Sequence, residues 1–73
     1  KDSESTIIFF ESPHRIKNTL KMMNEIMPEH KLVIARELTK RFEEFIRGSV
    51  KEVNEALRSR EVKGEIVVVV KRA

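Results

Sequence analysis

The sequence predicts a small α/β domain built on one mixed β-sheet. Three continuous apolar runs, rich in β-branched residues, each have the length of a strand. Two segments between these runs repeat apolar residues at the three- and four-residue spacing of an amphipathic helix. A shorter fourth strand is predicted inside the charged stretch that follows the second run. The resulting order, β-α-β-β-α-β, is that of a split βαβ, ferredoxin-like unit.

The length and composition agree with one globular unit. The chain has 73 residues, so we expect residues 1–73 to form a single domain with a small core. Hydrophobic residues make up 40% and charged residues 37%, which is typical of a folded domain. The net charge of +3 permits a nucleic-acid partner without requiring one. The chain has no cysteine and no membrane-length apolar run, so we expect no metal site, no membrane association and a cytoplasmic location.

The first strand is predicted over residues 6–10, and its unbroken apolar character suits a central strand covered on both faces. Ser12 is a good helix N-cap, and Pro13 suits the first helical position. The helix that follows has one apolar face, formed by Ile16, Leu20, Met23 and Met27. Pro28 ends it, because the residue before a proline disfavours helical geometry.

The second half of the chain is predicted to contain three more strands and a second helix. Residues 32–35 form a second buried strand, and residues 44–47 form the shorter strand, with Gly48 at its end. Ser49 and Glu52 have the spacing of a capping box, which starts a second helix. Residues 66–70, Ile-Val-Val-Val-Val, form the last strand. The second and third strands are joined by a loop, so they can run antiparallel.

The turn from Glu11 to Arg15 is the first candidate site. Helix capping explains Ser12 and Pro13, whereas His14 and Arg15 place cations where the helix dipole disfavours them. Such a turn suits an anion, which exposed backbone N–H groups and basic side chains bind together. A simple solvated pair is the alternative. Ser12 and His14 are two residues apart and do not face each other on a helix, so we exclude a nucleophile and base pair.

The charged stretch of residues 36–44 is the second candidate site. It follows the carboxyl end of the second strand, at the same sheet edge as the Glu11 turn, and ligands bind at this edge in open α/β sheets. Arg36 comes directly after four apolar residues, so an ion pair with Glu37 or Glu43 is at least as good an explanation as substrate binding.

Taken together, IIFFESPHRI, VIAREL, TKRFEEFIRGS and KGEIVVVV resemble one protein family. The chain is similar, over residues 6–70, to the methyltransferase I family, which methylates a cytidine 2′-hydroxyl of 16S ribosomal RNA. That family belongs to the tetrapyrrole methylase superfamily. The resemblance implies a two-lobed enzyme that holds S-adenosylmethionine between its lobes. It implies that this chain is the second, C-terminal lobe, without the N-terminal lobe that carries the glycine-rich loop, and inactive by itself.

Roles for the residues of both turns follow partly from the resemblance, which supplies the cofactor contacts, and partly from charge and position, which suggest the RNA contacts. Near the cofactor the resemblance places Phe10, Glu11, Ser12, Pro13 and Thr39. The reaction also needs a base, for which Glu11 and Glu37 are candidates on this chain and the missing lobe is an equal alternative. Because cations at the mouth of a cleft suit a polyanion, the candidates for RNA contact are His14, Arg15, Arg36, Lys40 and Arg41. The expected partners are 16S ribosomal RNA or the small ribosomal subunit, and a second copy in a homodimer.

Two alternative functions are open at this stage. An RNA-recognition module has the same element order and stacks bases on aromatic residues of its sheet. Phe9 or Phe10 and Phe45 offer such rings, although the aromatic-rich signature of that module is absent. A tetrapyrrole methylase would share the lobe and act on a small molecule, and the ESPHR turn argues against it.

Overall fold

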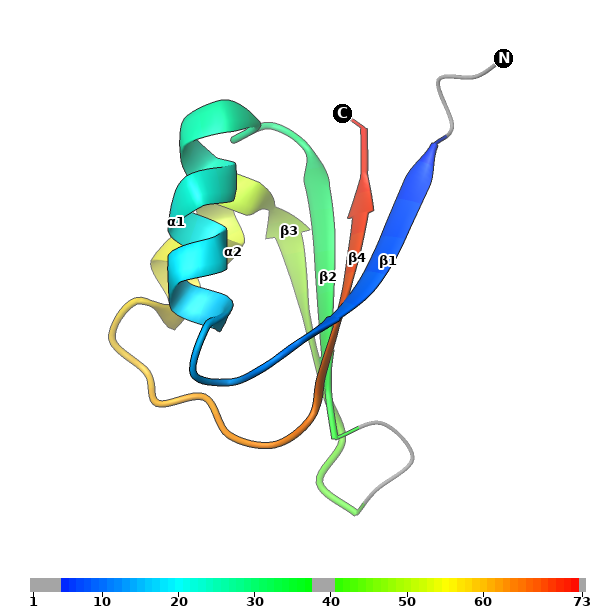
Figure 1. The fold of residues 1–73 in the computed structure, drawn as a ribbon, viewed down its shortest axis with the longest axis vertical. Helices are drawn as coiled ribbons and strands as arrows, with labels where there is room; N and C mark the ends of the chain where they lie inside the picture. Colours follow the sequence, from blue (N-terminus) through cyan, green and yellow to red (C-terminus); the bar gives the residue numbers. More distant parts are fainter. Residues whose placement is uncertain (1–4, 38–40, 73) are drawn as a thin grey trace.

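The computed structural model describes residues 5–37 and 41–72, and it shows one four-stranded sheet with two helices (Figure 1). The elements, in chain order, are β1 (Thr6–Glu11), α1 (Ile16–Ile26), β2 (Lys31–Arg36), β3 (Glu44–Ser49), α2 (Val50–Leu57) and β4 (Ile66–Lys71). The predicted α/β class and the predicted β-α-β-β-α-β order are therefore confirmed. None of the described helices is long and apolar enough to cross a membrane.

The sheet has the strand order β1-β4-β2-β3, and all three neighbouring pairs are antiparallel. A mixed sheet was predicted because the crossover through α1 gives β1 and β2 the same direction. In the structure β4 lies between these two strands, so no parallel neighbours form. Both βαβ connections are split in this way, since β2 likewise lies between β3 and β4.

The core lies between the two helices and one face of the sheet (Figure 1). Ile16, Leu20 and Met23 of α1 pack with Val50, Val53 and Leu57 of α2, all of which are buried. Alternate strand residues complete this core, as strand geometry requires, and these are Leu32, Ile34, Ile66, Val68 and Val70. The opposite face of the sheet carries no helix (Figure 1).

The prediction that the first strand is central and covered on both faces is wrong. β1 is an edge strand, and Ile7, Ile8 and Phe10 are 60%, 63% and 81% exposed. The two central strands are β4 and β2, and β4 pairs with β1 on one side and with β2 on the other. An unbroken apolar run identifies a strand, but it does not distinguish a strand covered on both faces from one whose outer face is exposed.

The predicted start of α2 is confirmed, whereas the predicted N-cap of α1 at Ser12 is wrong, because the N-cap is Arg15 and makes no side-chain cap bond. The Ser12 hydroxyl accepts hydrogen bonds from the backbone N–H groups of His14 and Arg15, yet regular α1 geometry begins one turn later than predicted, at Ile16. At α2 the capping box is complete, because Ser49 and Glu52 each accept from the other's backbone N–H. Gly48, at φ +152°, leaves room for this box, since a Cβ there would lie 2.8 Å from the Glu52 carboxylate.

Candidate functional site

The two predicted turns meet at one end of the sheet, as expected from the common direction of β1 and β2. They line a hollow of about 570 Å³. Its walls are Phe10, Glu11, Ser12 and Pro13 from the first turn, Glu37 from the second, and Gly64, Glu65 and Ile66 at the start of β4. The start of β4 was missed by the sequence analysis because nothing in residues 64–66 marks them as neighbours of the other two turns.

Glu11 is held by the start of α1. Its carboxylate accepts hydrogen bonds from the Thr19 hydroxyl at 2.6 Å and from the Ser12 backbone N–H and Arg15 Nε at 3.1 Å each. These bonds, that of Thr19 foremost, lower the pKa of the Glu11 carboxyl. A carboxylate stabilised in this way fixes the turn in place and accepts a proton poorly.

His14 and Arg15 are exposed on the outside of the same turn. The Arg15 side chain is 70% exposed although it pairs with Glu11, so its remaining donors face solvent. The first turn of α1 itself holds no acidic residue, so Glu11, which precedes the helix, is the carboxylate that pairs with Arg15. Exposed cations next to a hollow are available to a negatively charged ligand.

A second hollow lies beside the first and adds two cations that the sequence analysis did not select. Its volume is about 490 Å³, and His14, Lys17 and Lys63 line it together with Glu61. Lys17 was detectable, because it lies one helical turn after His14 and such residues share a helix face. Lys63 was not, because only the path of the chain into β4 brings it to α1.

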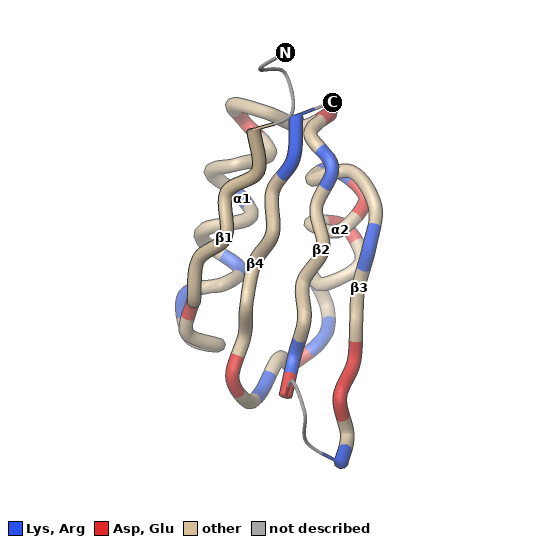
Figure 2. Tube along the Cα trace, turned by 90° about the vertical axis from the view of Figure 1, so that its right-hand side faces the viewer, with Lys and Arg blue, Asp and Glu red and all other residues tan. Residues whose placement is uncertain are grey.

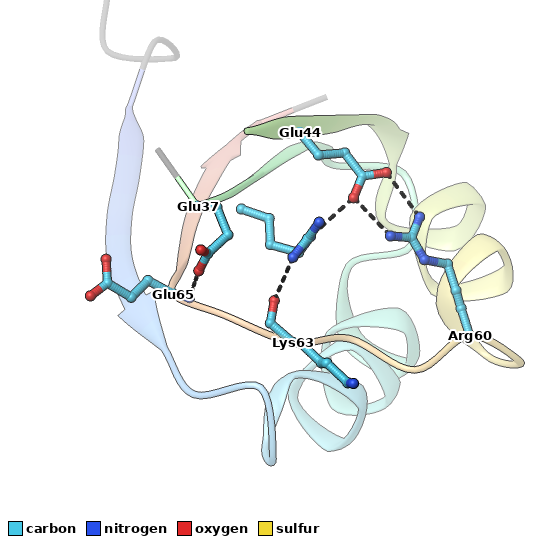
Figure 3. Close-up of polar contacts among 6 residues, drawn as sticks. Glu37, Glu44, Arg60, Lys63 and Glu65 are labelled. Atoms are coloured by element: carbon cyan, nitrogen blue, oxygen red, sulfur yellow. Dashed lines mark hydrogen bonds and ion pairs between the residues drawn. The ribbon is translucent and has the colours of Figure 1, made fainter. Parts of the chain in front are cut away.

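Glu37 lies in the second turn and contacts the segment before β4. Its backbone N–H donates to the Glu65 carbonyl at 2.9 Å, and its carboxylate accepts from the Glu65 N–H at 2.8 Å (Figure 3). Glu37 has φ +57°, which is uncommon for a residue with a side chain. Gly64 has φ +89° and leaves the space that the Glu37 carboxylate occupies. Glu37 therefore joins the two segments.

Arg36 is only 19% exposed and belongs to an ion cluster at the same end of the sheet. Its Nε donates to the Glu44 carboxylate at 3.0 Å, and its Nη1 donates to the Lys63 carbonyl at 2.8 Å. Arg60 binds both oxygens of Glu44, at 2.7 and 3.1 Å (Figure 3). The partner of Arg36 is thus Glu44, where the sequence suggested Glu37 or Glu43.

This cluster changes the acidity of its members. The bonds from Arg60 first, and then from Arg36, lower the pKa of Glu44 to about 2. The same contact with Glu44 raises the pKa of Arg60. The cluster ties the β2–β3 end of the sheet to the segment between α2 and β4, so the geometry gives Arg36 a structural role. Its predicted contact with RNA stays a prediction.

The remaining predicted residues lie in the β2–β3 loop. Arg41 is exposed, and its guanidinium lies 5.7 Å from the centre of the Phe42 ring. Thr39 and Lys40 fall outside the described residues.

Comparison with known proteins tests the predicted resemblance. The chain is 46% identical over 70 residues to the ribosomal RNA small subunit methyltransferase I of Bacillus subtilis (strain 168), which covers 96% of this chain and 24% of that protein. The proteins of the same name from Hydrogenobaculum sp. (strain Y04AAS1) and Neisseria meningitidis serogroup B (strain ATCC BAA-335 / MC58) are 50% and 48% identical. These matches cover 89% and 86% of this chain. The resemblance to the methyltransferase I family is confirmed.

The match is to a part of these relatives. The chain spans 24%, 29% and 22% of the length of the three proteins, about a quarter of each. No family model matches the chain. The segment that matches contains both turns and all three parts of the hollow.

Proposed function

We propose that this chain is the second lobe of a methyltransferase that modifies a cytidine ribose 2′-hydroxyl in the RNA of the small ribosomal subunit. The observation that carries the proposal is the hollow at the sheet end. Two turns 25 residues apart in the sequence, at Ser12 and Glu37, line this hollow. Both turns lie in the segment that is 46% identical to the ribosomal RNA small subunit methyltransferase I of Bacillus subtilis (strain 168). A cytoplasmic location and a homodimeric state belong to the same proposal.

The residues of the hollow fit part of a cofactor site. Phe10 offers an 81% exposed ring at the rim, and the Ser12–Pro13 turn lies beside it. An aromatic face and a polar turn suit the flat base and polar groups of a nucleoside. S-adenosylmethionine would supply an activated methyl group as a sulfonium. In this proposal, Phe10, Glu11, Ser12 and Pro13 form the wall that this lobe provides, and Thr39 belongs to the same wall.

Transfer of a methyl group from a sulfonium to the ribose would break a carbon–sulfur bond, leaving a thioether, form a carbon–oxygen bond and release the hydroxyl proton. The reaction therefore needs alignment of the two reactants and an acceptor for that proton. Glu11 and Glu37 are the candidates on this lobe. Because each carboxylate accepts hydrogen bonds from its neighbours, we propose that both act chiefly as positioning residues. Their substitution would then alter the binding of substrate more than the pH dependence of the rate.

The cations around the turn suit the phosphates of the RNA. His14 and Arg15 are exposed, Arg41 lies on the next loop, and Lys17 and Lys63 line the adjoining hollow. Phosphate contacts position a nucleic acid without reading its sequence. We propose that these residues orient the RNA, and that Lys40 belongs with them, whereas Arg36 acts through the ion cluster.

The alternative of an RNA-recognition module is not favoured by the sheet. Phe10 and Phe45 occupy the two edge strands, whereas the central strands place Val67 and Ala35 in the row between them. Three strand spacings separate the two rings, about 14 Å. Bases stacked on them would not be successive nucleotides of one strand.

Methyl transfer by the full-length protein tests the proposal. Labelled S-adenosylmethionine and small ribosomal subunits from a strain that lacks the enzyme are the substrates. We expect label in the small-subunit RNA with the intact protein and none when residues 1–73 are removed. Label that fails to appear with the folded, intact protein contradicts the proposed substrate.

A further inference from the structure

A groove runs between the two helices on the surface that faces away from the sheet. α1 and α2 cover one face of the sheet (Figure 1), and Figure 2 shows both helices side by side behind the strands. Leu20 and Leu57, which belong to the core, form the floor of the groove, whose volume is about 400 Å³. The polar residues of its walls include Lys17, Asn18, Lys21 and Asn24 of α1, and Asn54 and Arg58 from α2 and its C-cap. We call it the interhelical groove.

The walls of the interhelical groove keep a positive charge. Glu55, the carboxylate among the described residues that line the groove, pairs with Arg58 at 3.2 Å. Lys21 is exposed and forms no ion pair within the part of the chain that the structure describes. Lys17 Nζ donates to the Arg58 carbonyl at 3.3 Å, which leaves two of its three donors available. Two lysines therefore remain free to bind an anion, next to carboxamides that both donate and accept hydrogen bonds.

Asn24 contributes an unsatisfied polar atom to the wall. Its amide oxygen is buried and accepts no hydrogen bond from any residue that the structure describes. A buried acceptor without a donor costs free energy, and a ligand that supplies a donor recovers this cost. The terminal torsion of an asparagine side chain is soft, so the amide can turn toward the groove at little cost. Asn24 therefore suits a ligand that offers a hydroxyl or N–H donor.

We propose that the interhelical groove binds the ribose-phosphate backbone of an RNA strand. Lys17 and Lys21 contact phosphate oxygens, and the Asn24 amide oxygen accepts a hydrogen bond from a ribose 2′-hydroxyl. That hydroxyl is the group by which a protein distinguishes RNA from DNA. The two lysines are four residues apart on α1, about 6 Å along the helix axis, so they can reach two phosphates of one strand.

Two observations favour RNA as the occupant. Lys17 lines both this groove and the hollow beside His14 and Lys63, so the groove continues the row of cations that the proposed function assigns to RNA. The polar walls are also unlike the mostly apolar pockets that bind small molecules. An acidic protein segment is the competing occupant, because it too would pair with the lysines. The proposal rests on the proposed function only for the identity of the RNA, which is that of the small ribosomal subunit.

The first test removes a phosphate contact from the full-length protein. Lys21→Ala deletes a cation that lines the interhelical groove and neither of the two hollows. Filter binding to small-subunit RNA should show a severalfold loss of affinity. The slope of log affinity against log salt should become shallower by roughly 0.7–0.9, the equivalent of one phosphate. Lys51→Ala is the matched control, because Lys51 is exposed on α2 outside the groove and its loss should change neither quantity.

The second test removes the acceptor for the ribose hydroxyl. Asn24→Leu replaces the amide with an apolar group of similar size. The affinity of the full-length protein for a single-stranded oligoribonucleotide should fall about threefold or more, and its affinity for DNA of the same sequence should stay unchanged. Urea denaturation should show no loss of stability, because the variant removes a buried acceptor that has no donor among the described residues. Asn24→Ala replaces this variant if the leucine does not fit.

Three results overturn the proposal. One is a Lys21→Ala protein with the RNA affinity and salt dependence of the wild type. Another is an Asn24→Leu protein that loses no affinity for RNA, or loses RNA and DNA affinity equally. The third is a Lys21→Ala protein that binds whole small subunits more weakly but free RNA as well as the wild type, since the groove then binds a protein segment. Methyl transfer by the wild type is measured separately, and its absence together with the expected binding losses would contradict the proposed function alone.

Discussion

The two turns that line the hollow use their charged residues in opposite ways. In the first, His14 is exposed and Arg15 is 70% exposed although it pairs with Glu11, and the Glu11 carboxylate is held by Thr19 as well. In the second, Arg36 is 19% exposed and bound by Glu44 and the Lys63 carbonyl, and Glu37 bonds the Glu65 backbone. Two turns of similar composition thus differ in role. The first has cations available to a ligand, and the charged residues of the second hold neighbouring segments of the fold together.

The difference follows from where each turn sits in the sheet. β1 is an edge strand, so the turn after it borders solvent on one side. β2 is central, and the turn after it is enclosed by β3 and by the segment that enters β4. A charged side chain next to a central strand loses water and needs a partner, whereas one beyond an edge strand stays hydrated. Position in the sheet decides which charged residues remain free to bind a ligand.

Gly64→Ala should disrupt the second turn most. The new Cβ would coincide with the space of the Glu37 carboxylate, and φ +89° strains any residue with a side chain. We expect a loss of about 2–3 kcal/mol in the free energy of unfolding, measured by urea denaturation of the chain. Ser59→Ala, on the same connecting segment and exposed, should change it by less than about 0.5 kcal/mol. In a Glu37→Ala background the effect of Gly64→Ala should shrink; an unchanged effect would locate the strain in the backbone alone.

Glu44→Ala should destabilise the chain by about 2 kcal/mol, because it leaves Arg36 and Arg60 without their shared carboxylate. Thermal or urea unfolding measures the change. The control is Glu55→Ala, which removes the ion pair with Arg58. The Arg58 and Glu55 side chains are 66% and 70% exposed, so this substitution should change the free energy of unfolding little. Equal effects of the two substitutions would show that the cluster is no more than a surface pair.

The same cluster predicts how stability depends on pH. The pKa of Glu44 is about 2 in the folded chain, against about 4.3 in an unfolded one. Its contribution is therefore complete above pH 4.3 and is lost as the pH falls toward 2. Because these side chains are a third exposed, we expect about 1 kcal/mol from this group. The free energy of unfolding of Glu44→Gln should be lower than that of the wild type at pH 7 and should approach it near about pH 2. Parallel curves of unfolding free energy against pH would exclude Glu44 as the titrating group.

Arg15→Ala should have the smallest effect on stability and a large effect on RNA binding. The exposed Arg15–Glu11 pair contributes little, and removal of a cation from the helix start relieves an unfavourable dipole contact. We expect a change in unfolding free energy below about 0.5 kcal/mol. In the full-length protein the affinity for small-subunit RNA should fall severalfold, with a weaker salt dependence.

The control for that substitution is Lys51→Ala. Lys51 is exposed in the first turn of α2, at the opposite end of the sheet from the hollow (Figure 1). Its loss removes the same charge and should leave RNA binding unchanged. If both substitutions weaken binding equally, net charge accounts for the effect and the first turn has no special role.

The sequence alone identified the parts of this chain. The apolar runs located β1, β2 and β4, the periodic positions from Ile16 to Met23 located α1, and Ser49 with Glu52 located the start of α2. These signals are local, because each depends on a few neighbouring residues and the geometry of one helix turn or strand. The common end of β1 and β2 was also predictable, since a crossover through one helix gives both strands the same direction.

Only the tertiary structure decided how the parts are arranged. It placed β4 between β1 and β2, which moved β1 to the edge of the sheet and left Ile8 and Phe10 exposed. It also chose Glu44 as the partner of Arg36 and brought Gly64 to Glu37. No local sequence pattern predicts these contacts, because they join residues that are brought together only when the strands pair. They follow from the packing of the whole sheet against two helices.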